Sequence, residues 1–187
     1  MFTQCLHLSW CRSITRRYYA APTIHHAIIA SRPDSTTSLK GIRIRMICNG
    51  AGELVPSLAS RMKEVFTGAA ILPSYGMTEL VSSHLRFTPI FYDFDRCMPI
   101  TTPPINYQLD RPRSSGIICG PHLSIRDPAD IERSLPVGKT GAICVRGIPT
   151  FEGYEVSPDD SVPLDRSAFS RDGWFNTGDV GYMDADG

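Results

Sequence analysis

The sequence predicts an α/β fold whose second half is rich in β-strands. In the first half, short apolar runs alternate with segments of helical spacing, in the order strand, helix, strand, helix, strand. In the second half, prolines recur too often for a long helix, at positions 89, 99, 103, 104, 112, 121, 128 and 136. The composition is that of a globular domain, since 42% of the 187 residues are hydrophobic and 20% are charged.

The expected elements of the first half are strand 18–21, helix 23–30, strand 42–48, helix 56–66 and strand 69–72. Pro22 precedes the first helix, where its fixed φ suits a helix start. The second helix carries apolar residues near helical spacing at 58, 62, 65 and 66, and Gly68 is expected to end it. Together these elements predict a sheet covered by helices.

Three short strands are expected in the second half, over 116–119, 122–125 and 142–145. The expected organisation is an unpatterned lead-in over 1–17, an α/β subdomain over 18–98 and a β-rich subdomain over 99–187. The lead-in contains Arg12, Arg16 and Arg17 and no acid, a composition also found in mitochondrial targeting segments. An aberrant start of the reading frame is the favoured explanation.

Charge and cysteine content exclude several classes of function. Nineteen basic and nineteen acidic residues cancel, which disfavours nucleic acid as a partner. The six cysteines form no Cys-x-x-Cys pair, and no apolar run approaches the roughly 18 residues of a membrane span. We therefore expect an intracellular protein without a transmembrane segment, cytoplasmic or peroxisomal, with a mitochondrial location as the alternative.

The segment Ser74-Tyr75-Gly76-Met77-Thr78-Glu79 carries three groups suited to a nucleotide. It follows the apolar run 69–72, so it is expected to begin at the end of a strand, where such sheets build sites. The ring of Tyr75 can stack on a base, and the hydroxyl of Thr78 can bond a phosphate. Glu79 supplies a hard oxygen ligand suited to Mg²⁺.

A second segment, Asp172-Gly173-Trp174-Phe175-Asn176-Thr177-Gly178-Asp179, lies about a hundred residues later in the chain. Its last residue, Asp179, is an acceptor-only carboxylate beside a flexible glycine. Two adjacent sugar hydroxyls need such an acceptor. The two segments together indicate a site that binds a nucleotide.

In this order and at this separation, the two segments resemble the signatures of the AMP-forming adenylation superfamily. That family includes acyl-CoA synthetases, luciferases and the adenylation domains of peptide synthetases. The resemblance covers roughly residues 18–187, and oxalate–CoA-ligase-like members are the nearest in character. It is supported by Tyr18–His26, by the Gly-Ala-rich segment Cys48–Leu54, by Lys139–Gly147 and by Gly153–Tyr154.

The resemblance implies a role for each matching residue. Gly50, Ala51 and Gly52 would line the base or acyl side, and Tyr75, followed by Gly76, would stack on adenine. Three further residues would contact the rest of the nucleotide and its cation. Of these, Thr78 would bond the α-phosphate, Glu79 would hold Mg²⁺, and Asp179 would bind the ribose; Thr78 and Glu79 would be catalytic.

Each of these assignments has a structural alternative that the sequence leaves open. Tyr75 is the residue type of a core aromatic, Glu79 that of an acid at a helix start, and Asp179 that of a turn residue. His25 and His26 could lie near an acyl pocket, but a structural role is at least as well supported. They are therefore not included among the catalytic residues.

The implied fold is part of the large N-terminal domain of an adenylate-forming enzyme, in which an α/β subdomain leads into a barrel-like β-rich subdomain. The implied function is ATP-dependent acid–thiol ligation with ATP/AMP, Mg²⁺ and coenzyme A as cofactors and a small carboxylate as substrate. Two alternatives are the adenylation domain of a multidomain peptide-synthetase or reductase-like protein and a non-catalytic AMP-binding remnant.

Two parts of the family pattern are absent from the sequence. No triphosphate loop precedes the first segment, and the sequence stops at Gly187, before the C-terminal domain that supplies the family's catalytic lysine. We therefore expect a central fragment of a ligase that is inactive or nearly so by itself, and whether this chain is an enzyme stays open. A fragment that lacks its sheet partners would also risk failing to fold. The acyl substrate and the oligomeric state are not specified by these residues.

Overall fold

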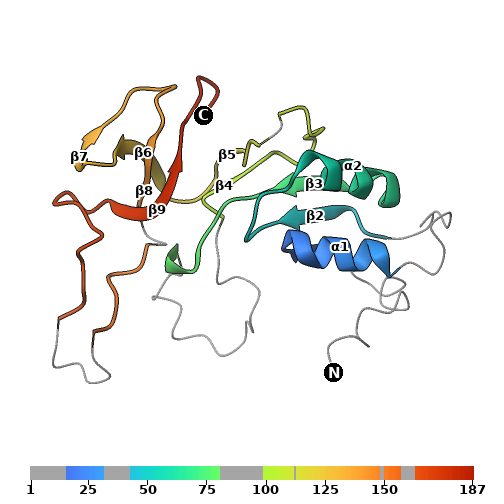
Figure 1. Cartoon of the computed structure of the whole chain (residues 1–187), viewed down its shortest axis with the longest axis horizontal. Coiled ribbons are helices and arrows are strands. Elements are labelled where there is room, and N and C mark those ends of the chain that lie inside the picture. The colour runs from blue at the N-terminus through green and yellow to red at the C-terminus, as the bar shows by residue number, and fades with distance from the viewer. Residues whose placement is uncertain (1–15, 32–42, 81–98, 112, 148–149, 157–162) are drawn as a thin grey trace. The chain divides into compact units, whose positions relative to one another are not determined.

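The computed structural model describes residues 16–31, 43–80, 99–111, 113–147, 150–156 and 163–187 (Figure 1). The chain divides into two compact units: unit 1 takes residues 1–75 and 101–116, and unit 2 takes residues 76–100 and 117–187. The chain first passes from unit 1 to unit 2 between Tyr75 and Gly76, returns to unit 1 at Thr101 and leaves it again after Gly116. Residues 1–15 of the expected lead-in lie outside the described residues.

Unit 1 contains a three-stranded parallel sheet with the order β1-β2-β3. Its elements are β1 (Arg17–Ala20), α1 (Pro22–Ala30), β2 (Met46–Asn49), α2 (Pro56–Val65), β3 (Ala70–Pro73) and β4 (Thr101–Thr102). The strands are in register along the row Tyr18, Ile47 and Ile71. The alternation of strands and helices confirms the α/β prediction for this part of the chain.

Both helices of unit 1 begin at a proline, Pro22 in α1 and Pro56 in α2, and neither has a side-chain N-cap. Proline suits this position because the first helical N–H has no intrahelical partner. The chain turns after α2 at Gly68, whose φ of 84° favours glycine. Because Pro22 is itself the first helical residue, α1 starts one residue before the predicted range 23–30.

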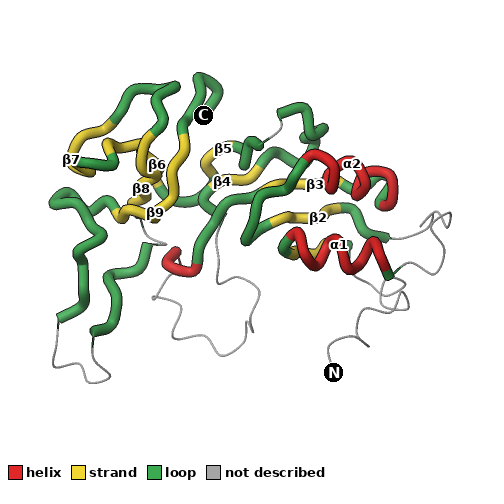
Figure 2. The backbone as a smooth tube through the Cα atoms, viewed as in Figure 1, coloured by secondary structure: helices red, strands yellow, loops and turns green. Residues whose placement is uncertain are grey.

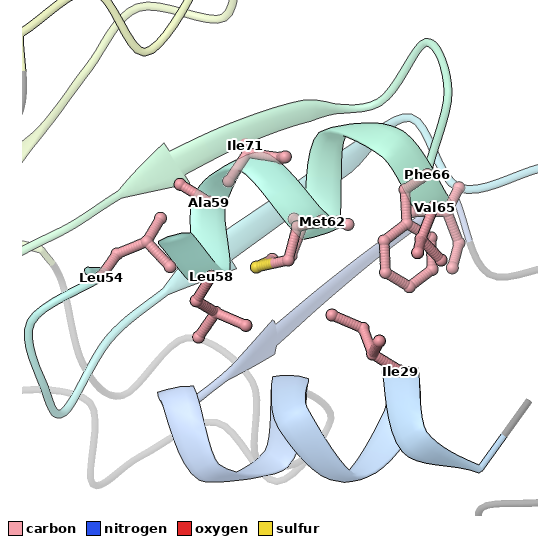
Figure 3. Close-up of a cluster of buried hydrophobic side chains, with 10 residues drawn as sticks. Ile29, Leu54, Leu58, Ala59, Met62, Val65, Phe66 and Ile71 are labelled. Carbon is pink, nitrogen blue, oxygen red and sulfur yellow. The ribbon is translucent and has the colours of Figure 1, made fainter. Parts of the chain in front are cut away.

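The core of unit 1 lies between the sheet and the inner face of α2 (Figure 3). Leu58 and Met62 of α2 are fully buried, and Ile29 of α1 and Ile71 of β3 belong to the same cluster. Figure 3 shows Leu58, Met62 and Val65 on the side of α2 that faces α1, with Ile29 directed toward them. This packing explains why the helical spacing of α2 was visible in the sequence.

All three strands of this sheet differ in extent from the prediction, and β1 starts and ends one residue earlier than the predicted 18–21. Strand β2 covers Met46–Asn49, the four residues with register partners in both β1 and β3, so it starts after residues 43–45 of the predicted strand 42–48. Residue 42 lies outside the described residues. Strand β3 includes Pro73, which pairs in register with Asn49. In the described three-stranded sheet β3 is the last strand, and an edge strand tolerates a proline.

Unit 2 contains a four-stranded antiparallel sheet with the order β7-β6-β8-β9 (Figure 2). Its elements are the 3-10 turn η3 (Thr78–Leu80), β5 (Ile117–Ile118), β6 (His122–Asp127), β7 (Asp130–Ser134), β8 (Gly141–Arg146) and β9 (Phe175–Gly181). Within the described residues this sheet is open and forms no closed barrel. The β-rich character expected for the second half is confirmed.

Strands β7 and β9 lie where the sequence predicts none. The residues of β7, Asp-Ile-Glu-Arg-Ser, are mostly exposed and carry no apolar alternation. They form a strand because the turn 127–130 returns the chain along β6, with the carboxylate of Asp127 accepting the N–H of Ala129 at 2.9 Å. Strand β9 is paired with β8, which is about 30 residues earlier in the chain, so no local pattern announces it.

Across the described ranges, no helix reaches the length and apolarity that a membrane-spanning helix requires.

Candidate functional site

The loop Gly50–Gly52 follows β2 and is held against the start of α1. The N–H of Gly50 donates to the carbonyl oxygen of Ala20 at 3.1 Å. A Cβ placed on Gly52 would lie 3.2 Å from the ring of Pro22, and Ala51 has a φ of 55°, in the left-handed region. The loop therefore has a defined backbone conformation, with Ala51 exposed at its tip.

Two buried polar side chains lie near this loop, Asn49 at the end of β2 and His25 in α1. Asn49 is 2% exposed, and its Nδ2 donates to the carbonyl oxygen of Gly52 at 2.7 Å. His25 of α1 is 0% exposed, and its Nδ1 lies 3.2 Å from the hydroxyl of Tyr18. The Nε2 of His25 and the Oδ1 of Asn49 have no hydrogen-bond partner. The pair links β1, α1 and β2 to the loop.

Burial lowers the pKa of His25, and hydrogen bonding to the Ala20 backbone and the Asn49 side chain offsets only part of this effect. The Asn49 side chain lies close enough to act on His25 without the geometry of a full hydrogen bond. His25 is therefore neutral in the folded protein at neutral pH. This result supports a structural role for His25 rather than one in an acyl pocket.

We expect the stability of unit 1 to fall as the pH is lowered, because His25 must remain neutral. Its pKa in the unfolded chain is about 6.5, above the folded value, so its contribution is complete above about pH 6.5. That contribution is lost as the pH falls through the folded pKa, with a slope of at most about 1.4 kcal/mol per pH unit. Urea midpoints from about pH 8 to pH 5, followed by far-UV circular dichroism, measure it.

The variant His25→Gln removes the titrating group and is expected to flatten this dependence. The matched control is His122→Gln, which removes an exposed histidine of unit 2. An unchanged slope in His25→Gln, or an equal flattening in His122→Gln, would contradict the assignment.

Tyr75 lies just beyond β3, at the same sheet edge as the loop Gly50–Gly52. The N–H of Ser74 donates to the carbonyl oxygen of Asn49 at 2.8 Å, which brings the ends of β2 and β3 together. Tyr75 pairs with Thr101 through two backbone hydrogen bonds of 3.0 and 3.1 Å. Its ring is half-buried. Unit 1 thus places an aromatic ring and an ordered loop at the carboxyl ends of neighbouring parallel strands, the edge where α/β sheets bind ligands.

Thr78 and Glu79 lie in unit 2, in the short turn η3, which the fully buried Leu80 anchors. The hydroxyl of Thr78 donates to Oε2 of Glu79 at 3.2 Å, and the hydroxyl of Tyr154 donates to Oε1 at 3.0 Å. The backbone carbonyl of Glu79 accepts the N–H of Phe151 at 2.8 Å. Both oxygens of the carboxylate are therefore oriented, and each keeps a lone pair for a cation.

Asp179 lies on β9 at an irregularity of the sheet. Ala142 pairs with Val180 and Cys144 pairs with Asn176, so three residues, 177–179, stand opposite the single residue Ile143. The hydroxyl of Thr177 donates to the carbonyl of Ile143 at 2.9 Å and accepts the N–H of Asp179 at 3.2 Å. Gly178 has a φ of 81°. This bulge leaves Asp179 exposed, and bulges commonly redirect a side chain next to a site.

The first residues of the second segment, Asp172–Asp179, have a structural role. The carboxylate of Asp172 accepts hydrogen bonds from Ser170 at 2.6 Å and from Arg126 at 3.2 Å, and these lower its pKa, with Ser170 the larger cause. The guanidinium groups of Arg126 and Arg146 each lie 4.6 Å from the ring centre of Trp174. These contacts fix the residues that lead into β9.

The sequence-predicted residues fall into two groups, one in each unit. Unit 1 contains Gly50, Ala51, Gly52 and Tyr75, and unit 2 contains Gly76, Thr78, Glu79 and Asp179. From the sequence, Tyr154 served only as support for the family resemblance and was assigned no role, although it contacts Glu79. The two residues are 75 positions apart, and no motif spacing links them.

A hollow of about 360 Å³ in unit 1 is lined by residues that include Arg45, Lys63, Gly68, Tyr107 and Leu109. Arg45 and Gly68 precede β2 and β3, so this hollow lies at the amino ends of the strands. The loop Gly50–Gly52 and Tyr75 lie at the opposite, carboxyl ends. The hollow is therefore not part of the candidate site.

The part of the chain that the structure describes contains no cluster of three or more histidine, cysteine, aspartate or glutamate side chains arranged to hold a metal ion. Mg²⁺ is commonly bound by only one or two carboxylates together with water and substrate phosphates, and Glu79 could be such a carboxylate.

A family model and individual relatives both match this chain over most of its length. The model of the family described as AMP-binding enzyme matches residues 14–155. A probable CoA ligase, CCL9, from Humulus lupulus is 33% identical over 174 residues, which cover 91% of this chain and 28% of that protein. The oxalate–CoA ligase of Arabidopsis thaliana is 33% identical over 171 residues, with the same coverage of 91% and 28%.

Among solved structures, ATP-bound MatB from Rhodopseudomonas palustris matches with a TM-score of 0.70 and 25% identity, covering 98% of this chain and 31% of MatB. The chain thus spans less than a third of the length of each of these three relatives.

Proposed function

The chain belongs to the AMP-binding enzyme family of adenylate-forming CoA ligases, and on that premise we propose that it binds adenylate for an ATP-dependent acid–thiol ligase. In the proposed reaction, a carboxylate oxygen of the substrate attacks the α-phosphorus of ATP. An acyl-adenylate forms and pyrophosphate leaves. The thiol of coenzyme A then attacks the acyl carbon, the acyl–phosphate bond breaks, and a thioester, AMP and a proton result.

The oriented carboxylate of Glu79 is the observation that carries this proposal. Negative charge increases on the oxygens around the α-phosphorus as the carboxylate attacks. A Mg²⁺ ion supplies compensating positive charge when bound, and Glu79 would hold it. Thr78, adjacent in the same turn, would turn its hydroxyl from Oε2 of Glu79 toward an α-phosphate oxygen when ATP binds.

The base and the sugar would be held by the other proposed residues. The half-buried ring of Tyr75 would stack on adenine, with Gly76 following it in the chain and the backbone of the loop Gly50–Gly52 lining the base. Asp179, exposed on the bulge of β9, would accept hydrogen bonds from both ribose hydroxyls. Binding and orientation of the reactants would account for much of the rate enhancement.

Coenzyme A as acceptor is supported by the relatives, since the Humulus lupulus protein is named a probable CoA ligase and the Arabidopsis thaliana protein an oxalate–CoA ligase. The substrate class is accordingly a small carboxylic acid.

The variant Asp179→Asn is expected to weaken AMP binding by about 10- to 100-fold, because hydrogen bonds to a charged group contribute about 1.5–3 kcal/mol. Isothermal titration calorimetry with AMP measures this effect without Mg²⁺. Asp110→Asn is the control, because it removes an exposed carboxylate of unit 1. Absence of AMP binding by the wild-type chain would contradict the proposed function, and equal affinities of the wild type and Asp179→Asn would contradict the role of Asp179.

A further inference from the structure

Tyr154 reaches Glu79 from a distant part of the chain. Its hydroxyl lies 3.0 Å from Oε1 of Glu79, across a sequence separation of 75 residues. The adjacent Phe151 donates its backbone N–H to the carbonyl oxygen of Glu79 at 2.8 Å. The segment 151–154 therefore holds both the backbone and the carboxylate of Glu79.

Tyr154 is itself held in place by backbone pairing and by ring packing. It exchanges two backbone hydrogen bonds with Asp165, at 3.0 and 2.8 Å. Its ring packs edge-on against Phe151, with centroids 4.7 Å apart and planes at 71°. A second edge contact joins it to the buried Phe175, at 6.4 Å. The hydroxyl is thus presented by a ring with few alternative positions.

The hydroxyl of Tyr154 acts as the donor in this pair. A phenol hydroxyl, with an ordinary pKa near 10, carries its proton at neutral pH, and an ionised carboxylate has none to give. The carboxylate, an acceptor only, then receives one hydrogen bond on each oxygen, from Tyr154 and from Thr78.

We propose that Tyr154 is a positioning residue, whose hydroxyl orients the carboxylate of Glu79 for the cation that accompanies the phosphates of ATP. The proposal rests on the proposed function, because it assumes that Glu79 binds Mg²⁺. Partners that hydrogen-bond a metal ligand fix its orientation, and their loss typically costs about 10- to 100-fold in metal affinity.

Stability alone gives little reason for this contact. Tyr154 is 43% exposed, so water competes for its hydroxyl and reduces the stability that this hydrogen bond contributes. The ring contacts with Phe151 and Phe175 do not require the hydroxyl. Tyr154→Phe therefore keeps the packing and removes only the group that reaches Glu79.

The test compares ATP affinity with and without Mg²⁺ in the 187-residue chain, by calorimetry. Tyr154→Phe is expected to lower the ratio of the two affinities by about tenfold. The control is Tyr182→Phe, the same substitution at an exposed tyrosine beyond β9, which is expected to keep the wild-type ratio. A purely structural role would weaken ATP binding in both conditions equally and leave the ratio unchanged.

A second variant shows whether Tyr154 acts through Glu79. Glu79→Gln is expected to lower the Mg²⁺ ratio, and adding Tyr154→Phe is expected to lower it no further. An unchanged ratio in a folded Tyr154→Phe variant, or an additional loss in the double variant, would overturn the inference. A wild-type chain that binds no ATP, or a Glu79→Gln variant with the full Mg²⁺ ratio, would instead refute the proposed function on which the inference rests.

Discussion

Replacing Phe175 with alanine is expected to destabilise unit 2 by about 3–5 kcal/mol, the usual cost of deleting a large buried aromatic side chain. Phe175 is 1% exposed at the start of β9, and it pairs across the sheet with the fully buried Val145. Its ring centre lies 5.0 Å from that of Phe151 and 5.1 Å from that of Phe169. Removal of this ring leaves a cavity that these neighbours can fill only in part.

The same substitution is expected to affect the candidate site, because two residues that hold Glu79 pack on Phe175. Phe151 supplies the N–H bound by the Glu79 carbonyl, and Tyr154 supplies the hydroxyl bound by its carboxylate. Loss of their common support should therefore lower the Mg²⁺ dependence of ATP binding together with stability. In this respect Phe175→Ala differs from Tyr154→Phe, which keeps the packing.

Urea unfolding followed by tryptophan fluorescence measures the effect of Phe175→Ala on stability. The sequence has two tryptophans, Trp10 and Trp174, so a Trp10→Phe background lets Trp174 of unit 2 report alone. Val180→Ala is the matched control, since it is on the same strand, 66% exposed, and expected to change stability by less than about 0.5 kcal/mol. A loss below about 1 kcal/mol for Phe175→Ala would show that the aromatic cluster is not the core of unit 2.

Replacing Gly116 with alanine is expected to destabilise unit 1 by at least about 3 kcal/mol, because two separate costs add. Gly116 has a φ of 91°, a conformation that alanine rarely adopts. A Cβ at this position would also overlap the backbone of Thr102 and Pro103, which cannot turn aside as the end of a flexible side chain can. The strand next to Tyr75 would have to move.

This displacement matters for the candidate site. Thr101 forms the backbone pair with Tyr75, and the hydroxyl of Thr102 lies 2.9 Å from that of Ser74. We therefore expect Gly116→Ala to weaken AMP binding as well as stability, because Tyr75 would lose its support.

The control for Gly116→Ala is Gly68→Ala, in the same unit. Gly68 has a similar φ of 84°, but a Cβ there would meet nothing within 4 Å. It should cost only the backbone penalty, about 1–2 kcal/mol. Far-UV circular dichroism in urea reports on unit 1, which contains the helices α1 and α2. Equal losses in the two variants would show that the close approach at Gly116 has no energetic effect.

The sequence by itself determined the family and most of the first unit. Helix α2 was predicted correctly because Leu58, Met62 and Val65 form one buried face, and because Gly68 follows them. Such a face repeats with the period of the helix itself, so the signal is local. The residues proposed to bind adenylate were likewise read from three short segments, because the family's motifs are short.

Only the tertiary structure decided how these residues are supported. Strands β7 and β9, and the bulge that presents Asp179, depend on pairing with strands elsewhere in the chain. The burial of His25 beside Asn49 and the approach of Tyr154 to Glu79 depend on contacts between distant segments. A contact across 75 residues leaves no periodicity in the sequence, because it is the packing of the intervening chain that brings its two partners together.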